Sequence, residues 1–133
     1  MEKITVKMTK EMGFVPVGTK CSELNPKALM LLATADCAGR TAVGVFKKMK
    51  LTPESFEITV AGTISTDTMV AETVFTAFDI TYNVECATLT EQERFSHAIN
   101  LTHDKYCGML AMMRRIAPVT HNILIHSNQP QKA

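Results

Sequence analysis

Apolar and polar residues alternate along several short segments of the chain, and this period of two predicts β-strands. The clearest segment is residues 76–86, whose apolar side chains would all lie on one face of a sheet. The five expected strands cover residues 4–8, 14–17, 56–62, 76–86 and 119–125. Pro16 lacks a backbone N–H, so the second of these strands is expected at an edge of the sheet.

A run without internal proline, from residue 27 to about residue 49, predicts one long helix. Asn25 supplies a side chain that can cap the helix, and Pro26 suits its first position. Gly39 and Gly44 lower the helix propensity by about 1 kcal/mol each. We therefore expect another backbone to approach the helix closely at these glycines.

The apolar stretch inside this helix, residues 28–46, is about as long as a membrane span. Asp36 and Arg40 lie in the middle of the stretch, where charged side chains are costly in lipid. The stretch therefore favours a buried core helix and no membrane association. A helix this apolar needs cover on most of its circumference, and one small sheet covers only one side. A second copy of the chain is expected to cover the other.

Two shorter helices are expected in the last third of the chain. Thr90 and Glu93 have the spacing of a capping box, which predicts a helix from residue 91 to residue 100. A further helix is expected over residues 103–116, with Pro118 ending it. In this interpretation His103 and Asp104 form the first turn of the last helix.

Strands and helices do not alternate regularly, so the order of elements predicts an α+β fold. We expect a single domain over residues 1–133, with N-terminal strands in about residues 1–20 and a frayed tail over residues 127–133. Residues 65–71 are polar and predict a turn.

Composition narrows the class of protein. Of 133 residues, 46% are hydrophobic and 20% are charged, which excludes intrinsic disorder. Fourteen Lys and Arg against 13 Asp and Glu argue against a nucleic-acid partner. The first eight residues have no signal-peptide character, so a cytoplasmic location is expected. Nine Met and no Trp indicate a large, adaptable apolar contact surface.

The four cysteines carry the candidate chemistry. None forms a CxxC pair, and no histidine has metal-ligand spacing, so neither a metal nor a cofactor is expected. Cys86 lies on the apolar face of a predicted strand and is read as a small buried side chain. Two interpretations of Cys37 stay open. It is a buried thiol, or it is a reactive thiolate that Arg40 stabilises, although Arg40 could instead pair with Asp36.

Several segments together resemble the OsmC/Ohr family. An Asn-Pro start leads to a cysteine in an apolar helix, a long strand follows, and a Tyr-Cys pair lies in a late helix before an Ala-Pro-Val exit. The similar segments are residues 25–37, 45–49, 76–84, 91–100, 105–110 and 117–119. The similarity spans about residues 23–125, and its details are most like the branch known only as OsmC-like.

The resemblance implies an OsmC-like fold, with a long buried central helix packed on an antiparallel sheet, in an intertwined homodimer. It implies a thiol peroxidase of organic hydroperoxides, in which Cys37 is peroxidatic and Cys107 resolving. A dithiol of the lipoyl or thioredoxin type would regenerate the two thiols. An apolar pocket at the dimer interface would favour an organic peroxide over hydrogen peroxide.

Two departures from the family pattern open alternatives. Lys27 stands where organic hydroperoxide resistance members carry a Glu, and no Arg precedes Arg40. Glu23 and Arg40 are the candidates to replace those missing side chains. The alternatives are a non-catalytic member that binds a small apolar ligand or a partner in the dimer groove, and a thiol redox sensor that uses the same cysteines.

Overall fold

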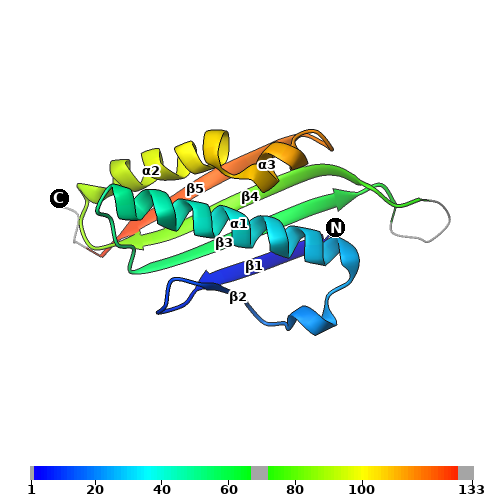
Figure 1. Cartoon of the computed structure of the whole chain (residues 1–133), viewed down its shortest axis with the longest axis horizontal. Coiled ribbons are helices and arrows are strands. Elements are labelled where there is room, and N and C mark those ends of the chain that lie inside the picture. The colour runs from blue at the N-terminus through cyan, green and yellow to red at the C-terminus, as the bar shows by residue number, and fades with distance from the viewer. Residues whose placement is uncertain (1, 67–71, 129–133) are drawn as a thin grey trace.

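A computed structural model describes residues 2–66 and 72–128, which form a five-stranded sheet with helices on one face (Figure 1). The strand order is β2-β1-β3-β4-β5. The strands are β1 (Glu2–Met8), β2 (Phe14–Pro16), β3 (Ser55–Ile64), β4 (Phe75–Cys86) and β5 (Val119–Ser127). All five predicted strands are confirmed, and β2, which contains Pro16, lies at an edge as expected.

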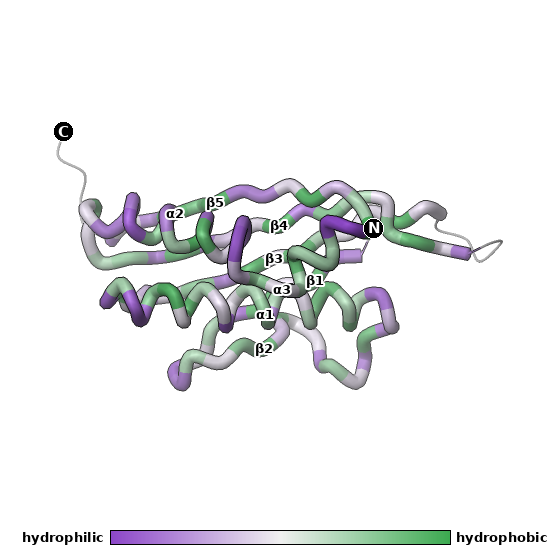
Figure 2. Tube along the Cα trace, turned by 45° about the horizontal axis from the view of Figure 1, so that its top comes forward, coloured by the Kyte–Doolittle hydropathy of each residue, from purple (hydrophilic) through white to green (hydrophobic). Residues whose placement is uncertain are grey.

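The helices form the second layer. They are α1 (Pro26–Lys48), α2 (Glu91–Leu101) and α3 (Gly108–Met113), with a 3-10 turn at Cys21–Glu23 and a π-helical turn at Thr102–Tyr106. In Figure 1, α1 and α2 lie next to each other over the sheet. Figure 2 shows that α1 is apolar along most of its length and polar at its C-terminal end.

Helix α1 begins as the sequence predicts and packs as a core helix. The Asn25 side chain accepts a hydrogen bond from the N–H of Ala28 at 2.9 Å, and Pro26 is the first helical residue. By length and composition alone, α1 could cross a membrane. However, one side of it is buried in the domain core. Its nine buried residues are Ala28, Leu31, Thr34, Ala35, Ala38, Gly39, Ala42, Val43 and Phe46.

The sheet is mixed, so the expected antiparallel sheet is wrong at one strand. β5 pairs with β4 in parallel, in a register that places Val119 opposite Phe78, whereas the other pairs are antiparallel. Parallel neighbours need a long crossover, and α2, the π-helical turn and α3 provide it. The hydrophobic pattern predicts a strand but carries no information about its direction.

The helix expected over residues 103–116 is broken. Residues Thr102–Tyr106 form a wider π-helical turn, Cys107 has an extended backbone with φ −82° and ψ 108°, and α3 begins at Gly108. The cause is tertiary packing, because side chains from β4 and β5 hold the turn from outside. Sequence periodicity does not detect such contacts.

Two local predictions are wrong, namely the capping box at Thr90 and the close approach of a backbone at Gly39. Thr90 makes no side-chain capping bond to α2, and its hydroxyl lies instead 3.1 Å from that of Thr88. A Cβ added to Gly39 would lie 2.5 Å from the Phe14 ring, so an aromatic side chain, not a backbone, approaches there. At Gly44, no described atom beyond the adjacent residues and the backbone of the same helix lies within 4 Å of such a Cβ.

Two further predictions fall largely outside the described residues. The turn expected over residues 65–71 is described only for its first two residues, where the N–H of Ser65 bonds the carbonyl of Val74 at 2.8 Å. Of the tail expected to fray after Ser127, the structure describes residue 128 alone.

Candidate functional site

Cys37 and Cys107, separated by 70 residues in sequence, meet in the structure. Their sulfur atoms are 3.5 Å apart, and the Cys107 thiol donates a hydrogen bond to the sulfur of Cys37. Cys37 lies in the middle of α1 and is partly exposed, whereas Cys107 lies between the π-helical turn and α3 and is 2% exposed. Both are free thiols, and closure to a disulfide requires only a short further approach of the two sulfurs.

The surroundings of Cys107 keep it protonated. The pKa of the Cys107 thiol is raised to about 11, mainly by burial and also by the neighbouring Cys37, against backbone hydrogen bonds from Leu110 and Met109 that lower it. At neutral pH Cys107 is therefore a thiol that donates its hydrogen. Cys37 is therefore the more exposed sulfur of the pair and accepts the hydrogen bond, whereas Cys107 is the buried donor.

The other sequence candidates lie outside this thiol pair. The Nε of Arg40 contacts Asp36 Oδ2 at 2.7 Å on the exposed side of α1, which is the pairing alternative named above. Glu23 lies in the 3-10 turn before α1, and Cys37 follows the start of that helix by about 16 Å of helical rise. The structure thus brings together Cys37 and Cys107 without Arg40 or Glu23.

The two remaining cysteines are separate from the pair. Cys21 is exposed in the 3-10 turn. Cys86 is fully buried on β4, as predicted, and its thiol donates to the carbonyl of Thr88 at 3.4 Å. A Cys21 variant therefore serves as a matched control for variants of the thiol pair.

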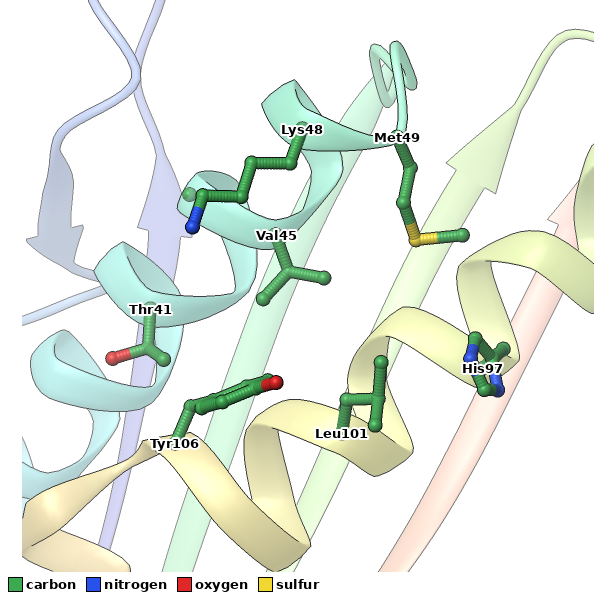
Figure 3. Close-up of a pocket in the computed structure, with 8 residues that line it drawn as sticks. Thr41, Val45, Lys48, Met49, His97, Leu101 and Tyr106 are labelled. Carbon is green, nitrogen blue, oxygen red and sulfur yellow. The ribbon is translucent and has the colours of Figure 1, made fainter.

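A groove of about 490 Å³ lies between α1 and the α2 region (Figure 3), and its lining includes sequence neighbours of both thiols but neither thiol itself. Thr41 is one helical turn beyond Cys37, and Tyr106 immediately precedes Cys107. Figure 3 shows Val45 and Leu101 facing each other across the groove. The lining residues are Thr41, Gly44, Val45, Lys48, Met49, His97, Leu101 and Tyr106. Aliphatic and aromatic side chains thus form much of the wall.

A buried polar network lies beneath the π-helical turn, and sequence analysis missed it. The Tyr82 hydroxyl lies 2.9 Å from Nδ1 of His103, and the His103 ring stacks on His121 at 3.9 Å between centroids. His121 in turn lies 3.3 Å from the side-chain oxygen of Asn100. Tyr82 is inward-facing by strand alternation, but nothing in the sequence pairs it with His103.

Among the described residues, no cluster of three His, Cys, Asp or Glu side chains could hold a metal ion.

Because burial lowers the pKa of His103 to about 4, we predict a loss of stability in mild acid. Burial is the largest cause of this pKa shift, His121 and Arg114 contribute in the same direction, Asp104 opposes them, and the neutral Tyr82 hydroxyl completes the surroundings. An unfolded histidine takes up a proton near pH 6.5, so the unfolded state binds more protons between about pH 6.5 and 4. The contribution of His103 to the free energy of unfolding is therefore fully present above about pH 6.5 and is lost as the pH falls toward about 4.

We expect the free energy of unfolding to drop by on the order of 2 kcal/mol between pH 7 and 4.5 through this group. Urea unfolding of the wild type and of His103→Asn at both pH values measures the contribution. The variant should show the smaller drop. Equal drops in the two proteins would show that His103 does not titrate in this window.

Comparisons with known proteins agree with this architecture. A family profile described as OsmC-like protein matches residues 19–122. A hypothetical protein from Aquifex aeolicus VF5 has a TM-score of 0.61 at 17% identity, covering 96% of this chain and 98% of that chain. No curated protein sequence matches the chain.

Two similar structures have names that indicate a function. The organic hydroperoxide resistance protein OhrB of Bacillus subtilis has a TM-score of 0.58 at 13% identity, over 92% of this chain and 98% of that chain. An organic hydroperoxide resistance protein OsmC from Legionella pneumophila has a TM-score of 0.56 at 17% identity, and the match covers 89% of this chain and 78% of that chain. At these identities the similarity shows the fold.

Proposed function

Because the chain belongs to the OsmC-like protein family, we propose that it is a two-cysteine thiol peroxidase that reduces organic hydroperoxides in oxidative-stress defence. The observation that carries the proposal is the 3.5 Å separation of the Cys37 and Cys107 sulfurs. Two thiols this close, one of them shielded from water, suit a cycle in which one is oxidised and the other resolves it.

The proposed cycle balances in three steps. The Cys37 thiol loses its proton, and the thiolate attacks the terminal peroxide oxygen. The O–O bond breaks, Cys37 becomes a sulfenic acid, and the alkoxide takes up that proton and leaves as an alcohol. The Cys107 sulfur then attacks the Cys37 sulfur and forms a disulfide, and the sulfenic oxygen leaves as water with the Cys107 proton. An external dithiol of the lipoyl or thioredoxin type reduces the disulfide and becomes a disulfide itself.

The groove supports an organic rather than an inorganic peroxide. Its apolar wall residues, such as Val45 and Leu101, can cover an alkyl or aryl group, and Tyr106 places one end of the groove next to Cys107 in sequence. Hydrogen peroxide has no apolar part to bury there. The proposal therefore includes a preference for hydroperoxides with a hydrophobic substituent.

The proposal also includes a homodimer in the cytoplasm, with residues 1–133 as one domain. Large apolar side chains are exposed on the helices next to the thiol pair in sequence, among them Met30 on α1 and Met112 at the end of α3. A second copy packed on these helices would cover them. Arg40 and Glu23 stay predictions as site residues, and Arg40 would act on Cys37 only after leaving Asp36.

Steady-state peroxide consumption with a small dithiol reductant tests the proposed activity. We expect turnover of cumene hydroperoxide with a kcat/KM at least about tenfold above that for hydrogen peroxide, because burial of the apolar group contributes to binding. The exposed-site variant Cys21→Ser should match the wild type. The proposal fails if cumene hydroperoxide is consumed no faster than by the dithiol alone.

The groove also favours a second candidate, a non-catalytic protein that carries a small apolar ligand. Native mass spectrometry of the purified protein distinguishes the two functions. A carrier retains a ligand and shows no turnover. The peroxidase gives a spectrum of protein alone and consumes peroxide.

A further inference from the structure

The position of the Cys107 thiol depends on an irregular turn. The N–H of Cys107 donates to the carbonyl of Thr102 at 2.9 Å, five residues back, which closes the π-helical turn Thr102–Tyr106. In a regular α-helix each residue advances by a fixed angle, so one widened turn redirects every side chain that follows. The turn and the extended backbone at Cys107 therefore determine whether this thiol faces Cys37.

Three of the contacts that hold this turn from outside involve His103. Its ring nitrogen Nδ1 lies 2.9 Å from the hydroxyl of Tyr82 on β4. Its ring stacks on that of His121 on β5, with 3.9 Å between centroids and 27° between planes. Its backbone carbonyl accepts a hydrogen bond from the guanidinium of Arg114. His103 thus attaches the turn to the sheet and to the end of α3.

The network is costly for a purely structural element. His103 is 3% exposed and Tyr82 is fully buried, and polar groups buried this deeply are tolerated only when they are hydrogen-bonded. An apolar pair of similar volume would fill the same space without that requirement. Neither residue lines the groove, so contact with a ligand there does not explain them. A directional hydrogen bond fixes an orientation, which apolar packing does less well.

We propose that His103 is a positioning residue of the thiol pair, which with Tyr82 holds the turn so that Cys107 remains within reach of Cys37. The inference rests on the proposed function only in that Cys37 and Cys107 form a disulfide. It concerns how readily that disulfide closes, not which oxidant drives it.

Equilibration with glutathione tests the inference without any peroxide. One oxidised glutathione and the protein dithiol give the Cys37–Cys107 disulfide and two reduced glutathiones, so atoms and electrons balance. The equilibrium constant reports how well the fold holds the two thiols together. Thiol-alkylation mass spectrometry across a series of glutathione buffers measures it for each variant.

Tyr82→Phe removes one oxygen atom, and His103→Leu removes the ring with little change of volume. We expect each to lower the equilibrium constant by about tenfold, which raises the reduction potential by about 30 mV, because the turn loses a directional hydrogen bond. His103→Asn retains a polar group near the position of Nδ1 and should restore the constant to within about threefold of wild type. Phe56→Leu, a core change on β3 among other aromatic rings, is the control for general destabilisation and should leave the constant unchanged.

The inference is overturned if Tyr82→Phe and His103→Leu both stay within about twofold of wild type, or if Phe56→Leu lowers the constant as much as they do. A wild type that forms no Cys37–Cys107 disulfide in any buffer overturns it as well. If His103→Leu does not fold, Tyr82→Phe decides the question. Disulfide closure that depends on His103, in a protein that consumes no peroxide, supports the inference and refutes the proposed activity alone.

Discussion

Replacing Cys37 with serine is expected to abolish peroxide turnover, lowering kcat/KM for cumene hydroperoxide by about three orders of magnitude or more. A serine hydroxyl is not ionised at neutral pH and cannot replace a thiolate as the nucleophile. Cys37 is the more exposed thiol of the pair and accepts the hydrogen bond from Cys107. Steady-state assays of Cys37→Ser beside Cys21→Ser measure the effect.

The Cys107→Ser variant should separate the two chemical steps. Its Cys37 still reacts with peroxide, but no neighbouring thiol resolves the sulfenic acid, so this acid accumulates and can be trapped by dimedone. If Cys37→Ser retains more than about a tenth of the wild-type rate, Cys37 is not the peroxidatic residue. Loss of all activity in Cys107→Ser, together with a sulfenic acid that dimedone traps at Cys107 in Cys37→Ser, would reverse the two roles.

Replacing Phe46 with alanine is expected to cost about 3–5 kcal/mol of unfolding free energy, because it leaves a cavity in the core. Phe46 is 1% exposed on α1, and its ring lies 5.4 Å from that of Phe56 on β3 and 4.9 Å from that of Phe95 on α2. One side chain therefore joins both helices to the sheet. Urea unfolding of the reduced protein measures the loss.

Leu124→Ala is the matched control for this variant. Leu124 is 54% exposed on the edge strand β5, so its truncation should change stability by less than about 0.5 kcal/mol. A loss under about 1 kcal/mol for Phe46→Ala would contradict the packing described above. The thiol chemistry should be unaffected in either variant under conditions where the protein is folded.

The elements with strong local signals could be predicted from the sequence. Helix α1 starts within one residue of the prediction because Asn25 and Pro26 mark its beginning chemically. Strand β4 starts within one residue because alternation continues over its full length. Both signals lie within the element that they define, so one sequence is sufficient to read them.

The parts that depend on distant contacts could not be predicted. The direction of β5 follows from how the crossover packs, not from the residues of the strand. The π-helical turn depends on Tyr82 and His121, which lie about twenty residues away on either side of His103. Helical spacing alone predicted a regular first turn there, because periodicity does not report contacts from another layer.

Some features of the candidate site could be predicted from the sequence, and others could not. The choice of Cys37 and Cys107 as a pair came from the family resemblance, since neither spacing nor composition joins two residues 70 positions apart. The possible pairing of Arg40 with Asp36 could be predicted, because residues four apart share a helix face. The groove could not, since its walls come from two helices and the turn between α2 and α3.

Mapping the thiols after treatment with one equivalent of cumene hydroperoxide tests the central claim most directly. The account predicts that the reduced protein consumes the peroxide, loses the mass of two hydrogen atoms and yields a peptide pair linked through Cys37 and Cys107. Cys21 and Cys86 should remain alkylatable after unfolding. A protein whose Cys37 and Cys107 both stay free while the peroxide persists would contradict the account.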